Sequence, residues 1–173
     1  MLEEDGSSNG ATSQEHTIIL SNKMRLVIQR VSRASVEIEG QLHSEIRRGL
    51  MILVGVREGD TPADVEWLVG KTAAMRIFPD ENGVMNRSLL DIGGEALAVS
   101  QFTLNASTRK GNRPSYIHAA GHDVAIPLYE MYCEKLSEAL GKPVARGVFG
   151  ADMQVSLIND GPVTIIIDSK IKE

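Results

Sequence analysis

The sequence predicts a single domain of mixed α/β class, with two packed β-sheets and helices on one outer face. Its 173 residues are 42% apolar, enough for one domain with a sizeable hydrophobic core. Short β-rich segments alternate with two segments of helical periodicity, in the order β-β-β-α-β-α-β-β. No segment repeats, and no glycine-rich phosphate loop joins a strand to a helix.

Three strands are expected before the first helix. Residues 24–31 are β-rich, and residues 34–39 alternate small or apolar with polar side chains until a turn at Gly40 and Gln41. Residues 49–56 form a continuous apolar run of strand length. Such a run is typical of a strand that is covered on both faces.

The first helix is expected to begin after Thr61 and to end near Arg76. Thr61 suits the N-cap and Pro62 the first helical position. Asp64 stands three residues after the cap, where a carboxylate can accept a hydrogen bond from the cap backbone. The helix should end before Pro79, because the residue before a proline avoids the helical conformation.

The second half of the chain predicts a strand, a polar segment, a second helix and two further strands. The strand covers residues 95–104, and residues 105–122 are more loop than element. The second helix is marked by an apolar stripe closed by Gly141, namely Tyr129, Tyr132, Cys133, Leu136 and Leu140. Strands at 153–158 and 163–167 should be joined by a hairpin-like turn at 159–162.

The composition excludes several classes of protein. A net charge of −5 argues against broad binding to phosphate backbones, and 4% aromatic residues argue against stacking of several unpaired bases. No apolar run approaches the roughly 20 residues of a membrane span. The single cysteine, Cys133, cannot form an internal disulfide, which favours a reduced, intracellular setting.

The first 23 residues differ in character from the rest. Residues 1–16 are rich in Gly, Ser and Asn and lack apolar periodicity, so residues 1–23 are expected to be a disordered extension. They fit neither a secretory signal nor a transit peptide. Four acidic residues against one lysine give this segment a net charge of −3, which leaves −2 for the domain expected at residues 24–173.

Residues 100–104 end an apolar strand with a hydroxyl, an amide and a second hydroxyl. Strand alternation places Phe102 on one face and Gln101 with Thr103 on the other. The segment is either a strand leaving the core or a polar wall that presents hydrogen-bonding groups to a ligand. A nucleophilic Thr103 would need an adjacent base, and no histidine, lysine or carboxylate stands at a telling spacing.

Two other segments have both a structural and a functional interpretation. Residues 159–162, Asn-Asp-Gly-Pro, are favoured as a plain turn, although a rigid Gly-Pro backbone could also point carbonyls into a pocket. Arg109, Lys110 and Arg113 suit either a solvated loop or one or two phosphate contacts.

Cys133 and the histidines are weaker candidates. Cys133 lies on the apolar stripe of the second helix and is expected to be a buried structural residue. His118 and His122 would share a helix face, but no third ligand stands near them. No metal ion or other cofactor is therefore expected.

Several of these segments resemble D-aminoacyl-tRNA deacylases of the type marked by a Ser-Gln-x-Thr motif and an Asn-x-Gly-Pro motif. Both motifs occur in this order, at residues 100–103 and 159–162. Similar segments also occur at residues 24–40, 76–86, 113–116 and 150–164. The resemblance runs from residue 24 to about residue 168 and leaves residues 1–23 without a counterpart.

The resemblance implies a cytoplasmic homodimer that hydrolyses the ester between a D-amino acid, or glycine, and the 3′-terminal adenosine of a tRNA. The pocket would lie at the dimer interface, and its catalytic wall would be Ser100, Gln101, Phe102 and Thr103. Phe149 and Met153 match positions that line the pocket near the adenosine. The terminal 2′-OH would help to activate water, while backbone amides near Phe102 and Thr103 stabilise the oxyanion.

Selectivity would come from the second conserved motif of the family. Gly161 and Pro162 of the partner subunit, joined by a cis peptide bond and following Asn159, would project their carbonyls into the pocket and leave no room for an L side chain. Arg30 matches the residue that braces this loop. Three alternatives remain open: a hydrolase of small acyl esters, a non-catalytic module that binds the 3′ end of tRNA, and a relative with a trans Gly-Pro bond that prefers glycyl-tRNA or L-alanyl-tRNA.

Overall fold

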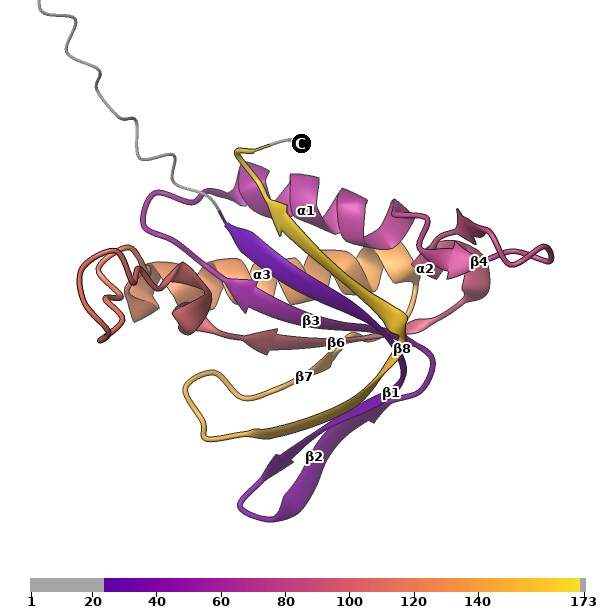
Figure 1. Ribbon diagram of the computed structural model, residues 1–173, viewed down its shortest axis with the longest axis horizontal. Helices are drawn as coiled ribbons and strands as arrows, with labels where there is room; N and C mark the ends of the chain where they lie inside the picture. Colours follow the sequence, from indigo (N-terminus) through magenta and orange to yellow (C-terminus); the bar gives the residue numbers. More distant parts are fainter. Residues whose placement is uncertain (1–23, 172–173) are drawn as a thin grey trace, which may run out of the picture.

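The computed structural model describes residues 24–171, so the expected extension at residues 1–23 lies outside the described residues (Figure 1). Along the chain the elements are β1 (Arg25–Ile38), β2 (Gln41–Ile46), β3 (Gly49–Gly55), α1 (Pro62–Ala74), β4 (Phe78–Pro79), β5 (Met85–Arg87), α2 (Leu89–Ile92), β6 (Glu95–Ser100), the 3-10 helix η1 (Phe102–Asn105), α3 (His122–Leu140), β7 (Ala145–Arg146) and β8 (Gln154–Asp168).

The main sheet has the order β2-β1-β3-β6-β7, and β8 pairs with β1. The first half of β1 pairs with β3 and its second half pairs with β2, while β8 runs antiparallel to β1 along both halves. In Figure 1 these two long strands bend together, so that β2, β7 and the first half of β8 form a layer beneath β3 and β6. β4 and β5 form a separate two-stranded sheet.

Two hydrophobic cores fill the space between three layers. The larger core lies between the sheet and the helices α1 and α3, and includes Leu26, Ile52, Leu68 and Tyr132. The smaller core lies between the two β layers, and includes Val31, Val36, Met51, Leu97 and Val99. Successive residues of β3 point into different cores, which explains its continuous apolar sequence. The expected β/β/α order of layers is confirmed.

The first helix forms as its capping sequence predicts. The backbone N–H of Thr61 donates to Asp64 Oδ2 at 2.8 Å, and Pro62 opens the helix. α1 packs against α3 through a buried hydrogen bond of 2.8 Å between Thr72 Oγ1 and the Tyr132 hydroxyl. Local capping and an apolar face therefore fix both the start of α1 and its side of the sheet.

Helix α3, which corresponds to the second helix expected from the sequence, carries the expected apolar stripe, and its Cys133 is a buried structural residue. Tyr129, Tyr132, Cys133 and Leu136 are buried against the sheet. Burial raises the pKa of the Cys133 thiol to about 11, so the thiol stays protonated and unreactive at neutral pH. None of the helices in the described part of the chain is long and apolar enough to span a membrane.

Several strands differ from those expected. Residues 24–31 and 34–39 belong to one strand, β1, and the strand β2 after the turn was not predicted. Residues 153–158 and 163–167 are two halves of β8, not the arms of a hairpin. The register of β8 against β1 shifts on either side of Val31, so the Asn-Asp-Gly-Pro segment bends the strand instead of reversing it.

Candidate functional site

A pocket of about 630 Å³ lies where β3 and β6 end. Three segments that are distant in sequence surround it: the η1 segment, the residues leading into α3, and the loop before β8. Its lining consists of Val54, Val56, Ser100, Gln101, Phe102, Thr103, Tyr116, Ala119, Ala120, Gly121, His122, Ala125, Phe149, Gly150, Ala151 and Met153. The four expected catalytic residues and the two expected adenosine contacts therefore share one cavity.

The first wall is the turn from β6 into η1. The strand ends at Ser100, and the N–H of Gln101 donates to the Val54 carbonyl at 2.8 Å. Gly55 allows η1 to approach β3, because a Cβ at this position would lie 2.9 Å from Leu104 Cβ. The expected strand at 95–104 is thus wrong after Ser100.

Gln101 and Thr103 are neighbours, but not because they share one face of a strand, as the sequence predicted. At the start of η1, where Gln101 is the N-cap, Gln101 Nε2 donates to Thr103 Oγ1 at 3.0 Å and ties the two polar side chains together. Phe102 is 56% exposed and meets the ring of Tyr116 edge to face, with centroids 5.0 Å apart. This wall therefore presents a hydrogen-bonded polar pair beside an exposed aromatic pair.

The second wall is formed by Phe149 and Met153, from the loop before β8. The Phe149 ring meets His122 edge to face at 5.4 Å and lies 6.1 Å from Tyr129. These contacts fix an aromatic surface opposite η1. A flat apolar surface of this kind suits the face of a purine base.

The third wall, residues 116–122, was missed as part of the site. From the sequence, His122 is a weak candidate for a metal ligand, and Ala119 and Ala120 have no predicted role. The resemblance included Tyr116 in an Arg-Pro-Ser-Tyr segment, which was the available signal. Small residues in a long polar loop carry no local pattern that marks them as pocket lining.

The pocket offers positioning groups but little acid–base chemistry. Among the described lining residues the ionisable side chains are Tyr116 and His122, and no carboxylate or lysine is present. The described residues also contain no group of three or more His, Cys, Asp or Glu side chains that could hold a metal ion. The arrangement is suited to orienting a substrate whose reacting water is activated by another group.

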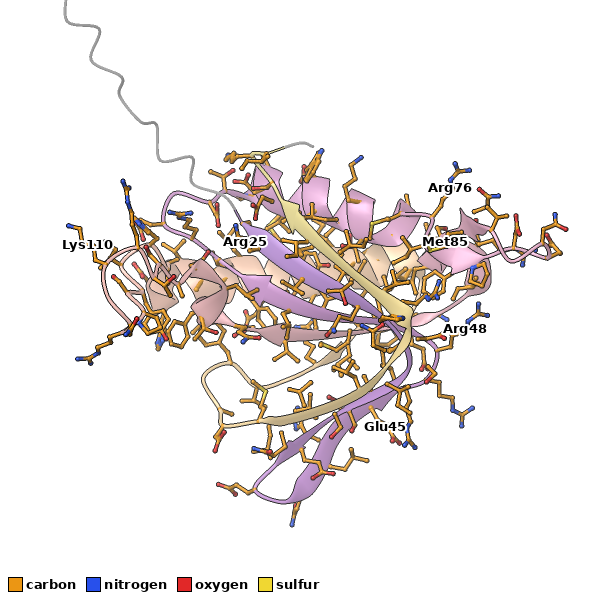
Figure 2. All side chains as sticks on the ribbon, viewed as in Figure 1. Arg25, Glu45, Arg48, Arg76, Met85 and Lys110 are labelled. Atoms are coloured by element: carbon orange, nitrogen blue, oxygen red, sulfur yellow. The ribbon has the colours of Figure 1, made fainter. Side chains whose placement is uncertain are left out.

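Gly161 and Pro162 do not line this pocket. They follow Asn159, which pairs with Val31, whereas the pocket lies at the other end of β3, beyond the pairing of Arg25 with Gly55. At about 3.3 Å per residue, these two ends of the strands are on the order of 15–20 Å apart. Figure 2 shows Lys110 at the pocket end and Arg48 at the bend of β8. The Gly161-Pro162 peptide bond is cis, as the resemblance implies.

Arg30 and Asn159 hold the Gly161-Pro162 segment in place. Arg30 is 9% exposed, and its Nε donates to the Asp160 carbonyl at 2.7 Å while its Nη1 donates to the Ile77 carbonyl at 2.6 Å. Asn159 Oδ1 accepts from the Val163 N–H at 2.8 Å. Both side chains therefore brace the loop from within the same chain.

The three expected phosphate contacts lie on an exposed loop that precedes a pocket residue, Tyr116. Arg109, Lys110 and Arg113 are exposed on the segment between η1 and α3. Backbone hydrogen bonds between Ser107 and Ser115 close this segment into a loop. The loop leads to Tyr116, which lines the cavity, but none of the three cations is itself a lining residue.

Comparisons with known proteins agree with these features. The family model described as "D-Tyr-tRNA(Tyr) deacylase" matches residues 27–168. Proteins named D-aminoacyl-tRNA deacylase from Phocaeicola vulgatus and Bacteroides thetaiotaomicron are 63% and 60% identical over 150 residues, which cover 87% of this chain and 100% of each relative.

Two solved structures have a similar fold. One titled "c-Myc DNA Unwinding Element Binding Protein" is 40% identical, with a TM-score of 0.79 over 83% of this chain and 97% of that chain. Another, described as a probable eukaryotic D-amino acid tRNA deacylase, is 19% identical with a TM-score of 0.73, over 84% and 99% of the two chains. With the family match and the curated relatives, the motif residues at the pocket and at the Gly-Pro bend place this chain in the D-aminoacyl-tRNA deacylase family.

Proposed function

We propose that this D-aminoacyl-tRNA deacylase acts as a homodimer, in which the Gly161-Pro162 segment of each subunit completes the pocket of the other. The observation that carries this proposal is the separation of the two motifs. Within one chain, Gly161 and Pro162 are exposed and lie at the opposite end of the strands from the pocket. A two-fold symmetric partner can bring the two surfaces together at two equivalent sites.

The substrate is the ester between a D-amino acid, or glycine, and the 3′-terminal adenosine of tRNA. Phe149 and Met153 contact the adenosine, since they form the apolar wall of the pocket. Ser100, Gln101, Phe102 and Thr103 orient the ester from the η1 wall. The hydrogen bond between Gln101 and Thr103 supports this assignment, because it restrains the side chains that meet the substrate.

Hydrolysis uses the terminal 2′-OH of the tRNA to help activate water. The lack of a carboxylate or lysine in the described lining supports this route over attack by a side chain. The amides of Phe102 and Thr103 lie in the first turn of η1, where N–H groups have no acceptor within the helix. They stabilise the negative charge that develops on the ester oxygen.

L-amino acids are rejected because the carbonyls of the partner subunit's Gly161 and the partner subunit's Pro162 occupy the space that an L side chain needs. Arg30 and Asn159 contribute by fixing the loop that carries those carbonyls. Glycine has no side chain and escapes this rejection. Arg109, Lys110 and Arg113 make a small number of phosphate contacts near the 3′ end, and the enzyme works in the cytoplasm.

The direct test is deacylation of D-tyrosyl-tRNA, L-tyrosyl-tRNA and glycyl-tRNA by the purified full chain. Rapid release from the D-tyrosyl and glycyl substrates, with the L-tyrosyl ester spared, is expected. A D-tyrosyl ester of adenosine and a simple acyl ester are assayed beside them. Equal cleavage of the simple ester would indicate a general esterase, and binding of D-tyrosyl-tRNA without release of tyrosine would indicate a non-catalytic module; either result contradicts the proposal.

A further inference from the structure

Asp60 is a buried carboxylate that the reaction described above does not use. It lies between β3 and α1 and is 7% exposed. Its Oδ2 accepts a hydrogen bond of 2.6 Å from the N–H of Arg57. Its Oδ1 is buried and has no hydrogen-bond partner in the structure. A half-satisfied buried carboxylate costs stability, so its presence calls for a role other than stabilising the fold.

The backbone that Asp60 holds is a clamp between two walls of the pocket. The Val56 carbonyl accepts from Asn105 Nδ2, at the end of η1, at 2.9 Å. The same carbonyl accepts from the N–H of Ala120 at 3.2 Å, and the N–H of Glu58 donates to the His118 carbonyl at 3.2 Å. Residues 56–58 therefore join the η1 wall to the wall at residues 116–122.

We infer that Asp60 is a positioning residue for deacylation, because its carboxylate fixes the 56–58 clamp and with it the spacing of the two pocket walls. Asp60 makes no contact with the cavity itself, and acts through the N–H of Arg57. This inference rests on the proposed placing of the substrate in this pocket. It adds a residue that neither sequence motif contains.

The surroundings of Asp60 make the clamp sensitive to pH. Arg57 on the same loop and Lys170 near the C-terminus favour its ionised form, while Asp64 on α1 opposes it. Burial is the largest effect, and the pKa of Asp60 is raised to about 6. Burial also opposes ionisation of Asp64, but hydrogen bonds from Ser169, Thr61 and Lys170 outweigh it and keep the pKa of Asp64 below its ordinary value.

Ionised Asp60 has opposite effects on stability and on the clamp. Because its folded pKa lies above the unfolded value of 3.8, the ionised carboxylate costs stability above about pH 6, and that cost is relieved as the pH falls from 6 towards 3.8. A charged acceptor holds an N–H more tightly than a neutral one. The hydrogen bond that fixes the clamp is therefore strongest above pH 6, where the buried ionised carboxylate also lowers the stability of the folded state.

The test compares Asp60→Ala and Asp60→Asn with the wild type and with Glu66→Gln, which removes a carboxylate from an exposed position on α1. KM and kcat for D-tyrosyl-tRNA are measured from pH 5 to 8, together with thermal stability. Amide hydrogen exchange is followed at Glu58 and Ala120. The exchange measurement needs no activity, so it reports on Asp60 even if wild-type turnover fails and the proposed function falls.

We expect Asp60→Ala to speed exchange at both amides and to raise KM at pH 7.5 about two- to tenfold, the size of one lost hydrogen bond, with kcat changed less. Asp60→Asn should show the higher KM at every pH, whereas the KM of the wild type should rise only below pH 6. At pH 7.5 Asp60→Asn should nevertheless melt at a higher temperature than the wild type. Glu66→Gln should match the wild type.

Unchanged KM and unchanged pH dependence of KM in folded Asp60→Asn would overturn the inference, whatever its stability. Faster amide exchange with unaltered KM would also overturn it, because the clamp would then loosen without affecting the substrate. Where Asp60→Ala does not fold, Asp60→Asn decides the question alone, since it keeps the size and one acceptor oxygen of the carboxylate.

Discussion

Gly161 occupies a position that accepts no other residue without rearrangement. Its φ of 145° is one that L side chains rarely adopt. An added Cβ would lie 2.9 Å from Val163 Cγ2 and 3.0 Å from Arg30 Nη2. Gly161 is thus packed against the arginine that braces its loop, and any side chain here would displace the carbonyls to which we assign the rejection of L-amino acids.

Gly161→Ala should lower kcat/KM for D-tyrosyl-tRNA by about 100-fold, the loss expected when reacting groups are misplaced by about 1 Å. Gly83→Ala is the matched control: it also has a positive φ, of 76°, but nothing lies within 4 Å of its added Cβ. The control should lose stability without losing turnover. Wild-type turnover by Gly161→Ala would contradict the role given to these carbonyls.

Thr103→Ala should keep substantial activity, with kcat lowered by less than about tenfold, because in the proposed mechanism the hydroxyl accepts a hydrogen bond from Gln101 and does not attack the ester. Single-turnover deacylation measures this directly. Loss of all activity in a variant that still folds and binds the substrate would show that Thr103 has a chemical role.

At the scale of elements, η1 lies in close contact with the end of β3 at Gly55. Gly55→Ala places a methyl group 2.9 Å from Leu104 Cβ and 3.3 Å from the Gln101 carbonyl oxygen. Overpacking of this kind should cost about 1–3 kcal/mol of unfolding free energy in urea titrations and should reduce kcat/KM, because η1 must move.

Gly70→Ala is the counterpart of Gly55→Ala, since its position in α1 has open space around the added methyl group. It should stabilise the protein by about 0.5–1 kcal/mol and leave turnover unchanged. Equal effects of the two alanine substitutions would mean that η1 does not depend on close contact with β3.

Elements with strong local signals could be predicted from the sequence, and those determined by tertiary pairing could not. The start of α1 could be predicted because its whole N-terminal signal, Thr61, Pro62 and Asp64, lies within four consecutive positions. In contrast, Asn-Asp-Gly-Pro has the composition of a hairpin turn, but β1 pairs with residues on both sides of it and keeps β8 running in one direction. A single-sequence pattern contains no information about that partner strand.

At the scale of the molecule, the expected site residues fall into two groups. One cavity brings together Ser100 to Thr103, from the end of β6 and the start of η1, and Phe149 and Met153, from the loop before β8. Gly161 and Arg30 lie at the far end of the strands. The wall at residues 116–122 was missed, because small residues in a polar loop gain their meaning only from the fold around them.

In the proposed dimer, two chains build each pocket. Gly161→Ala, which disables the loop, and Ala151→Trp, which fills the cavity, should each give a nearly inactive protein. Co-expression with two different affinity tags isolates the mixed dimer, and its rate of D-tyrosyl-tRNA deacylation is measured. In the mixed dimer the intact cavity of the Gly161→Ala subunit receives the intact loop of the Ala151→Trp subunit. One of the two sites is then complete, so about half of the wild-type rate should return. A mixed dimer as inactive as its parents, or a wild-type protein that is monomeric and fully active, would contradict the account.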